Sequence, residues 1–252
     1  MKVSLKTKII GLLLGLALTP ILKAADKFVT FNQEGGTLAL TTTQQPNFSI
    51  LCADEEHKGV LMAVRNLQED FFRVTNTRPY LKIGAKKQVD EGAQKLRILI
   101  GSFDKSPLIK QLVKAKKLDV RELKGRNEKF IITTVTNPIE GVEGEVLLIA
   151  GSDKRGTIYG IYELSCQIGI SPWYWWADVP VESHKEIYIK KGVYTDGEPA
   201  VKYRGIFIND EWPCMGGWTT ERYGGFNSKM YVHVYELLLR LKANFLWPAM
   251  WS

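Results

Sequence analysis

The stretch YRGIFINDEWPCMGGW, residues 203–218, decides how the second half of this sequence is interpreted. It belongs to a near-continuous apolar run that starts at Val201, as expected for a strand buried on both faces of a parallel sheet. The run ends in Asn209, Asp210 and Glu211, and a loop rich in Gly, Pro and Trp follows. A purely structural strand does not need two carboxylates and an amide at its carboxyl end. The competing interpretation is that Asp210 caps a turn and that Glu211 is only solvated.

A helix and a second strand follow the loop. Residues 227–243 carry apolar side chains at helical spacing, and NFLWPAMW, residues 244–251, is again an apolar strand. Strand, helix and strand make one βαβ unit, whereas a (β/α)₈ barrel needs eight such units in roughly 250 residues. We therefore expect residues 201–252 to form the first βαβ unit of an incomplete (β/α)₈ barrel.

Polar and aromatic side chains lie at the carboxyl ends of both expected strands, which is where barrel enzymes place their active sites. Asn209, Asp210 and Glu211 end the first strand, and Trp247 and Trp251 end the second. Carboxylates move protons at a glycosidic bond, amides bond to hydroxyl groups, and indole faces stack on sugar rings. The pattern predicts a sugar-binding mouth.

Residues 26–192 predict a separate α/β domain. Strands are expected in KFVTFNQEGGTLAL, where two flank a Gly-Gly turn, and in NFSILC and KFIITTV. An amphipathic helix is expected over residues 60–74. LRILIGSFDKSPLIKQLV and VLLIAGSDKRGTIYGIYEL each predict a strand, a Gly-Ser turn and a helix. The aromatic run at residues 173–176 either packs one domain on the other or lines a pocket, with packing favoured, and the Gly- and Pro-containing stretch after residue 190 predicts a linker.

The first 24 residues predict a signal peptide, with Lys2, Lys6 and Lys8 before a short apolar run and a small-residue pair, Ala24-Ala25, at its end. The apolar run is short for a membrane span, so we expect an exported, periplasmic or secreted protein. Loss of those three lysines and Lys23 lowers the formal charge from +7 to +3.

Composition and motifs exclude several other classes of protein. The basic residues are scattered, which argues against nucleic acid as a partner. The three histidines form no motif and the three cysteines have no metal-ligand spacing, so we expect neither a metal nor a disulfide framework, with Cys52 and Cys166 as small core residues. GSDKRGT, residues 151–157, has the glycine spacing of a phosphate loop but lacks its lysine, so no nucleotide or other cofactor is expected.

Three long motifs carry a family resemblance. YRGIFINDEWP, GGFNSKMYVHVYELLLRLKANFLWPAMW and GTIYGIYELSCQIGISPWYWWADVP, in residues 145–252, closely resemble glycoside hydrolase family 115, the xylan α-1,2-glucuronidases. The segment before residue 145 is similar, in pattern only, to the small α/β domain that precedes the barrel in hexosaminidases. The resemblance implies release of glucuronic acid or its 4-O-methyl form from glucuronoxylan, or from oligosaccharides derived from it, with inversion. A homo-oligomer of the full-length enzyme is compatible with it.

On the family pattern Asp210 is the expected catalytic or orienting residue, and Asn209, Glu211, Trp247 and Trp251 are expected substrate contacts. An inverting site needs two carboxyls about 6.5–9.5 Å apart, which adjacent residues on one strand do not provide because they point to opposite faces. The second carboxyl is therefore expected outside these 252 residues, and the chain alone is expected to be inactive. The alternative is a non-catalytic carbohydrate-contacting or scaffold domain.

Overall fold

The computed structural model describes residues 26–84, 95–209 and 211–248. Two expected site residues, Asp210 and Trp251, and the expected signal peptide lie outside the described residues. No helix in the described ranges is both long enough and apolar enough to cross a membrane.

Eleven strands and five helices make up the described part of the chain. The strands are β1 (Val29–Thr30), β2 (Thr37–Thr41), β3 (Ser49–Cys52), β4 (Tyr80–Ile83), β5 (Leu96–Ser102), β6 (Phe130–Thr136), β7 (Glu145–Gly151), β8 (Ile187–Lys190), β9 (Val193–Tyr194), β10 (Gly205–Phe207) and β11 (Phe245–Trp247). The helices are α2 (Lys58–Thr75), α3 (Pro107–Lys114), α4 (Lys154–Gln167), α5 (Cys214–Tyr223) and α6 (Ser228–Arg240).

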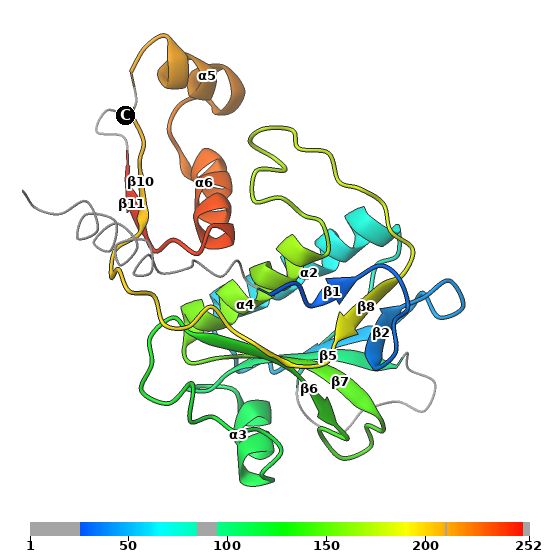
Figure 1. Ribbon diagram of the computed structural model, residues 1–252. Helices are drawn as coiled ribbons and strands as arrows, with labels where there is room; N and C mark the ends of the chain where they lie inside the picture. The colour runs from blue at the N-terminus through cyan, green and yellow to red at the C-terminus, as the bar shows by residue number, and fades with distance from the viewer. Residues whose placement is uncertain (1–25, 85–94, 210, 249–252) are drawn as a thin grey trace, which may run out of the picture.

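A six-stranded mixed sheet of order β4-β3-β5-β7-β6-β9 forms the centre of the molecule. Strands β4, β3, β5 and β7 run parallel, while β6 pairs antiparallel with both β7 and β9. Every residue of β5 is buried, as expected for a central strand covered on both faces. Helices α2 and α4 cover one face and α3 lies against the other (Figure 1). The predicted mixed α/β class is confirmed.

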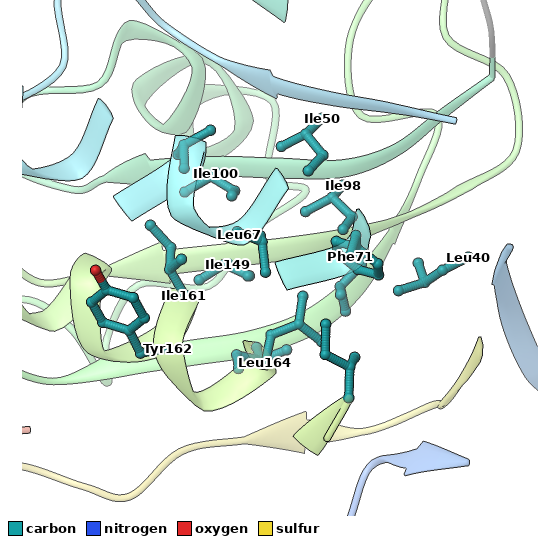
Figure 2. Close-up of a cluster of buried hydrophobic side chains, with 14 of the residues drawn as sticks. Leu40, Ile50, Leu67, Phe71, Ile98, Ile100, Ile149, Ile161, Tyr162 and Leu164 are labelled. Atoms are coloured by element: carbon teal, nitrogen blue, oxygen red, sulfur yellow. The ribbon is translucent and has the colours of Figure 1, made fainter. Parts of the chain in front are cut away.

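The larger core lies between the sheet and helices α2 and α4. Figure 2 shows side chains of this cluster, among them Leu67 and Phe71 of α2, Ile161 of α4, and Ile98 and Ile149 of the sheet. Residues four apart on α2 share one helix face, so Leu67 and Phe71 both enter the core. This packing fixes α2 and α4 as a rigid platform, and α6 packs against α4.

The two repeated strand–turn–helix segments are confirmed as β5–α3 and β7–α4. Asp153 is the N-cap of α4, and its Oδ1 accepts a hydrogen bond of 2.8 Å from the Gly156 amide. Its Oδ2 accepts another from the Glu128 amide. An aspartate carboxylate therefore occupies the helix start at which a phosphate loop would bind an anion.

The two strands predicted at the amino end exist but do not pair with each other. β8 lies between β1 and β2 and runs antiparallel to both, giving a three-stranded sheet of order β1-β8-β2. The Gly-Gly turn thus connects β1 to β2, and β8 lies between them. Because β8 begins 150 residues after β2, the sequence around the turn gave no sign of it.

Four further expectations are corrected by the structure. The predicted linker contains the short edge strand β9, the predicted Gly-rich loop contains helix α5, and Cys166 is exposed although Cys52 is buried. β10 was expected to be buried on both faces, but all three of its residues are exposed. The reason is that β10 pairs only with β11 within the described residues.

Candidate functional site

The candidate site lies at the carboxyl ends of β10 and β11, which pair in parallel as predicted. Gly205 aligns with Phe245 and Phe207 with Trp247. The backbones approach closely at the start of the pair, since a Cβ on Gly205 would lie 1.8 Å from the carbonyl oxygen of Phe245. Only glycine fits this position, which explains one residue of the Arg-Gly pair in the opening motif.

Alternate residues of the pair face opposite sides. Ile208 is buried and packs with Leu246 against Met230, Val234 and Leu238 of α6 in one apolar cluster. Phe207 and Trp247 are exposed, at 55% and 57%, and their rings meet edge to face with centroids 5.8 Å apart. Because strand side chains alternate, these two rings lie on the face opposite α6.

Three of the five expected site residues lie at this end of the pair, Trp247 on the aromatic face and Asn209 and Glu211 just beyond β10. Asn209 and Glu211 are both exposed and follow the last ladder hydrogen bond, in which the Ile208 amide donates to the Trp247 carbonyl at 2.9 Å. The structure therefore brings Asn209, Glu211 and Trp247 to one end of the pair. Their assigned roles stay predictions.

Phe207 and Trp212 are two aromatic residues at this end that we did not single out from the sequence. Trp212 is 69% exposed and directly follows Glu211. Phe207 could have been found from the alternation alone, because it lies two residues before Asn209 on the same strand face. An exposed indole, an exposed phenyl ring, an amide and a carboxylate together suit contact with a polyhydroxylated ring.

The aromatic run at residues 173–176 packs onto α6. This confirms, for residues 174–176, the prediction that the run packs one part of the chain on another. Trp175 stacks on His233 with centroids 3.8 Å apart, and the Trp176 indole donates to the His233 carbonyl at 3.1 Å. The Tyr174 hydroxyl donates to Glu236 at 3.0 Å. Trp173 remains exposed. The run thus holds the helix between the two candidate strands.

A buried ion pair ties the same helix to the α/β domain. Arg240 of α6 forms two hydrogen bonds with Asp70 of α2, at 2.9 and 3.1 Å, and neither side chain is more than 2% exposed. Its guanidinium also lies over the rings of Tyr162 and Tyr174. Burial alone would lower the pKa of Arg240, but the charge and hydrogen bonds of Asp70 outweigh burial and raise it. The arginine therefore stays charged.

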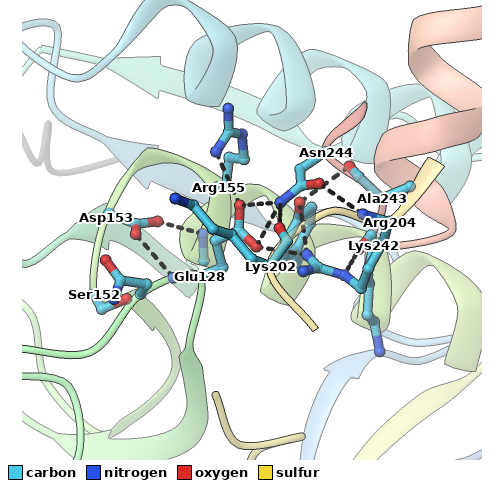
Figure 3. A network of polar contacts seen from close by, with 12 residues as sticks. Glu128, Ser152, Asp153, Arg155, Lys202, Arg204, Lys242, Ala243 and Asn244 are labelled. Carbon is cyan, nitrogen blue, oxygen red and sulfur yellow. Dashed lines mark hydrogen bonds and ion pairs between the residues drawn. The ribbon is translucent and has the colours of Figure 1, made fainter. Parts of the chain in front are cut away.

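The amino ends of β10 and β11 meet a second polar network, centred on Glu128 (Figure 3). Glu128 contacts Arg155, Arg204 and Asn244 at 2.5–3.1 Å. An open cleft of about 530 Å³ lies beside this network. It opens at the amino ends of β10 and β11, opposite the candidate site.

No group of three or more His, Cys, Asp or Glu residues suited to a metal ion occurs in the described part of the chain.

Comparisons with known proteins identify the family. The model of glycosyl hydrolase family 115 matches residues 196–252, which include β10, α5, α6 and β11. The solved structure of BtGH115A, a family GH115 4-O-methyl-alpha-glucuronidase with specificity for decorated arabinogalactans, is 30% identical to this chain with a TM-score of 0.67. The match covers 84% of this chain. The chain belongs to glycoside hydrolase family 115.

This family 115 chain spans about a quarter of the length of that relative, since the match covers 26% of BtGH115A. Two weaker likenesses to solved structures carry no argument. CpGH84D is 10% identical with a TM-score of 0.40, and the match covers 75% of this chain and 25% of CpGH84D. The Flavobacterium johnsoniae chitobiase FjGH20 is 14% identical with a TM-score of 0.36, and the match covers 73% of this chain and 21% of FjGH20. A search of curated proteins found no match.

Proposed function

We propose that this family 115 chain is part of an exported glycoside hydrolase that removes glucuronic acid or its 4-O-methyl form from side chains of glucuronoxylan. The carrying observation is the parallel β10–β11 pair, which presents Asn209 and Glu211 beside the exposed Trp247 at its carboxyl end. In this proposal residues 201–252 begin a (β/α)₈ barrel, and the α/β domain supports its first unit.

Each tip residue has a chemical role in the proposed reaction. Trp247 and Trp251 provide faces for stacking on the sugar, and Asn209 and Glu211 bond to hydroxyl groups. Asp210 orients or transfers a proton at the glycosidic bond. Inversion requires a second carboxyl about 6.5–9.5 Å away to activate water, and a later barrel strand supplies it.

The test is release of uronic acid from glucuronoxylan and from decorated arabinogalactan. Two proteins are compared: the 252-residue chain and a protein that continues through the downstream reading frame. We expect release by the longer protein only. Polysaccharide binding without release by either protein would support the non-catalytic alternative. Release by the 252-residue chain would contradict the need for a second carboxyl from a later strand.

Export is tested separately by N-terminal sequencing of the mature protein, which we expect to begin near Ala25. An intact Met1 on protein from the cytoplasm would contradict this part of the proposal.

A further inference from the structure

The side chain of Glu128 contacts the two residues that immediately precede β10 and β11. Arg204 Nη2 lies 2.5 Å from its Oε2, and Asn244 Nδ2 lies 2.9 and 3.1 Å from its two carboxylate oxygens. Glu128 belongs to the loop before β6, more than 70 residues away from Arg204 in sequence. One carboxylate of the α/β domain thus holds both strand starts of the barrel unit (Figure 3).

Arg204 and Asn244 are also bonded to each other. The Arg204 amide donates to Asn244 Oδ1 at 3.0 Å, and the Asn244 and Phe245 amides donate to the Arg204 carbonyl at 2.8 and 3.0 Å. Glu128, Arg204 and Asn244 therefore close a triangle, which we call the strand-start clamp. The clamp defines which residue of β10 lies opposite which residue of β11.

Glu128, which supplies the carboxylate of this clamp, is itself held by the start of α4. The Glu128 amide donates to Asp153 Oδ2 at 2.8 Å, and Arg155 Nη1 donates to Glu128 Oε1 at 2.9 Å. The Glu128 side chain is only 10% exposed. Its φ of 55° lies in the left-handed region that side chains rarely adopt, so surrounding contacts must hold it there.

The clamp lies close enough to the candidate site to set its geometry. Ile208 lies four residues after Arg204, which is about 13 Å of extended chain at 3.3 Å per residue. A pair this short has few ladder hydrogen bonds of its own, and the Ile208 amide makes the last of them, to the Trp247 carbonyl. A shift at the strand starts is therefore transmitted to Asn209 and Trp247.

We propose that Glu128 is a positioning residue for the strand-tip site, acting through Arg204 and Asn244 to align β10 with β11. This inference rests on the proposed function for the meaning of the site, but the alignment can be measured without any activity. Backbone amide hydrogen exchange, resolved by residue, reports it directly in the 252-residue chain.

The first variant is Glu128→Gln, which replaces one carboxylate oxygen with an amide that faces donors on Asn244 and Arg204. Hydrogen bonds to a charged group contribute about 1.5–3 kcal/mol, a factor of about 10 to 100 in an equilibrium. We expect protection of the Ile208 amide to fall about 10- to 100-fold, while amides of β5 and β7 keep their wild-type protection. A purely structural role would lower both sets together.

The matched control is Glu122→Gln. Glu122 pairs with Lys129 at 2.7 Å in the same part of the α/β domain, but its side chain is 71% exposed and makes no contact with the clamp in the described structure. We expect no change at Ile208 in this variant.

A second variant, Asn244→Ala, removes the link to β11 and leaves both arginine pairs of Glu128 in place. We expect the same selective loss at Ile208. Wild-type protection of Ile208 in both variants, or equal loss across β5, β7 and β10, would overturn the proposal. Failure of the uronic acid assay would leave this result standing, so the two hypotheses can fail separately.

Discussion

Asp70 is the residue on which the docking of α6 most depends, because its carboxylate is fully buried against Arg240. Removing one partner of a buried ion pair costs about 3–5 kcal/mol, and Arg240 would keep only Glu236, which is partly exposed and accepts from its Nε at 2.9 Å. We expect Asp70→Ala to lower the free energy of unfolding by an amount in that range, measured by urea titration. Glu69→Ala is the control, since its pair with Arg78 is exposed and should contribute less than about 1 kcal/mol. Equal losses of unfolding free energy in the two variants would show that the buried Asp70–Arg240 pair stabilises the protein no more than an exposed pair does.

The pH dependence of stability should carry a contribution from Glu128. Burial alone would raise the pKa of Glu128, but hydrogen bonds from Asn244, Arg204 and Arg155 outweigh it and hold the pKa below its ordinary value. The unfolded chain therefore binds this proton at a higher pH, about 4.3, than the folded chain does. The contribution is present above that pH and is lost as the pH falls through the folded value.

We accordingly expect the stability of the wild type to fall more steeply than that of Glu128→Gln between pH 5 and about pH 3. Urea midpoints measured across this range provide the comparison. Parallel curves for the two proteins would mean that Glu128 has the same proton affinity folded and unfolded.

Asp210 and Glu211 should differ in their importance for turnover in a catalytically complete version of the protein. A well-placed proton-transfer group contributes roughly 10²–10⁴ in rate. We expect Asp210→Ala to reduce kcat within that range and Glu211→Ala to have a much smaller effect, measured as uronic acid release. Small and equal effects at both positions would refute the assignment of Asp210.

At the level of the elements, the β10–β11 pair depends on a glycine at its first position. A Cβ at residue 205 would lie 1.8 Å from the Phe245 carbonyl oxygen, so Gly205→Ala must push the strands apart. We expect a loss of at least about 1–3 kcal/mol together with lost amide protection at Ile208. Gly35→Ala is the control, because nothing lies within 4 Å of its Cβ position and its φ is not positive. An unchanged Ile208 amide in Gly205→Ala would contradict the close approach.

The elements that periodicity could reveal were predicted, and the ones defined by distant partners were not. Helix α2 and strands β5, β6 and β7 have strong local patterns, and all were predicted. β8 and β9 are short strands whose partners lie far away in sequence, so their local pattern resembled a loop. Helix α5 begins with Cys, Met and two glycines, which have no apolar spacing to signal a helix.

The candidate site was predictable in part for the same reason. Asn209 and Trp247 were predicted as site residues because they lie at the carboxyl ends of two expected parallel strands, where active sites of barrel enzymes are found. Glu128 could not be found, because the residues that it holds, Arg204 and Asn244, lie 76 and 116 residues away in sequence. Such a contact depends on how whole elements pack, and no local pattern records it.

At the level of the whole molecule, the α/β domain and the segment that carries β10, α6 and β11 share an extensive interface. Asp70–Arg240 and the clamp cross it, Tyr159 donates to the Ala243 carbonyl at 3.0 Å, and Lys242 pairs with Glu163 and Asp196. We expect the 252-residue chain to unfold in one transition that includes residues 201–248, rather than with that segment mobile.

A polypeptide of residues 26–192 is still expected to fold, because both apolar clusters of the sheet lie within it. It should be less stable than the whole chain, since Asp70 loses Arg240. Ending the polypeptide at residue 195 retains β9 and should recover part of the difference. Calorimetry of the 252-residue chain and of the polypeptides 26–192 and 26–195 gives the three melting temperatures that test this order of stability. Equal melting temperatures would mean that the interface adds nothing to stability, and a disordered 26–192 polypeptide would contradict its autonomy.

The separation of 170 residues between Asp70 and Arg240 is also an interval of time. At a synthesis rate of roughly 5–20 residues per second, the arginine leaves the ribosome about 10–30 s after the aspartate. Helix α4 ends at Gln167, 73 residues before Arg240, so the α2–α4 surface is complete but faces water for about the last 4–15 s of that interval, with a carboxylate at the position that α6 will cover. The nascent α/β domain therefore keeps a hydrated acceptor site for α6, and that site closes only when residues 228–240 have been made.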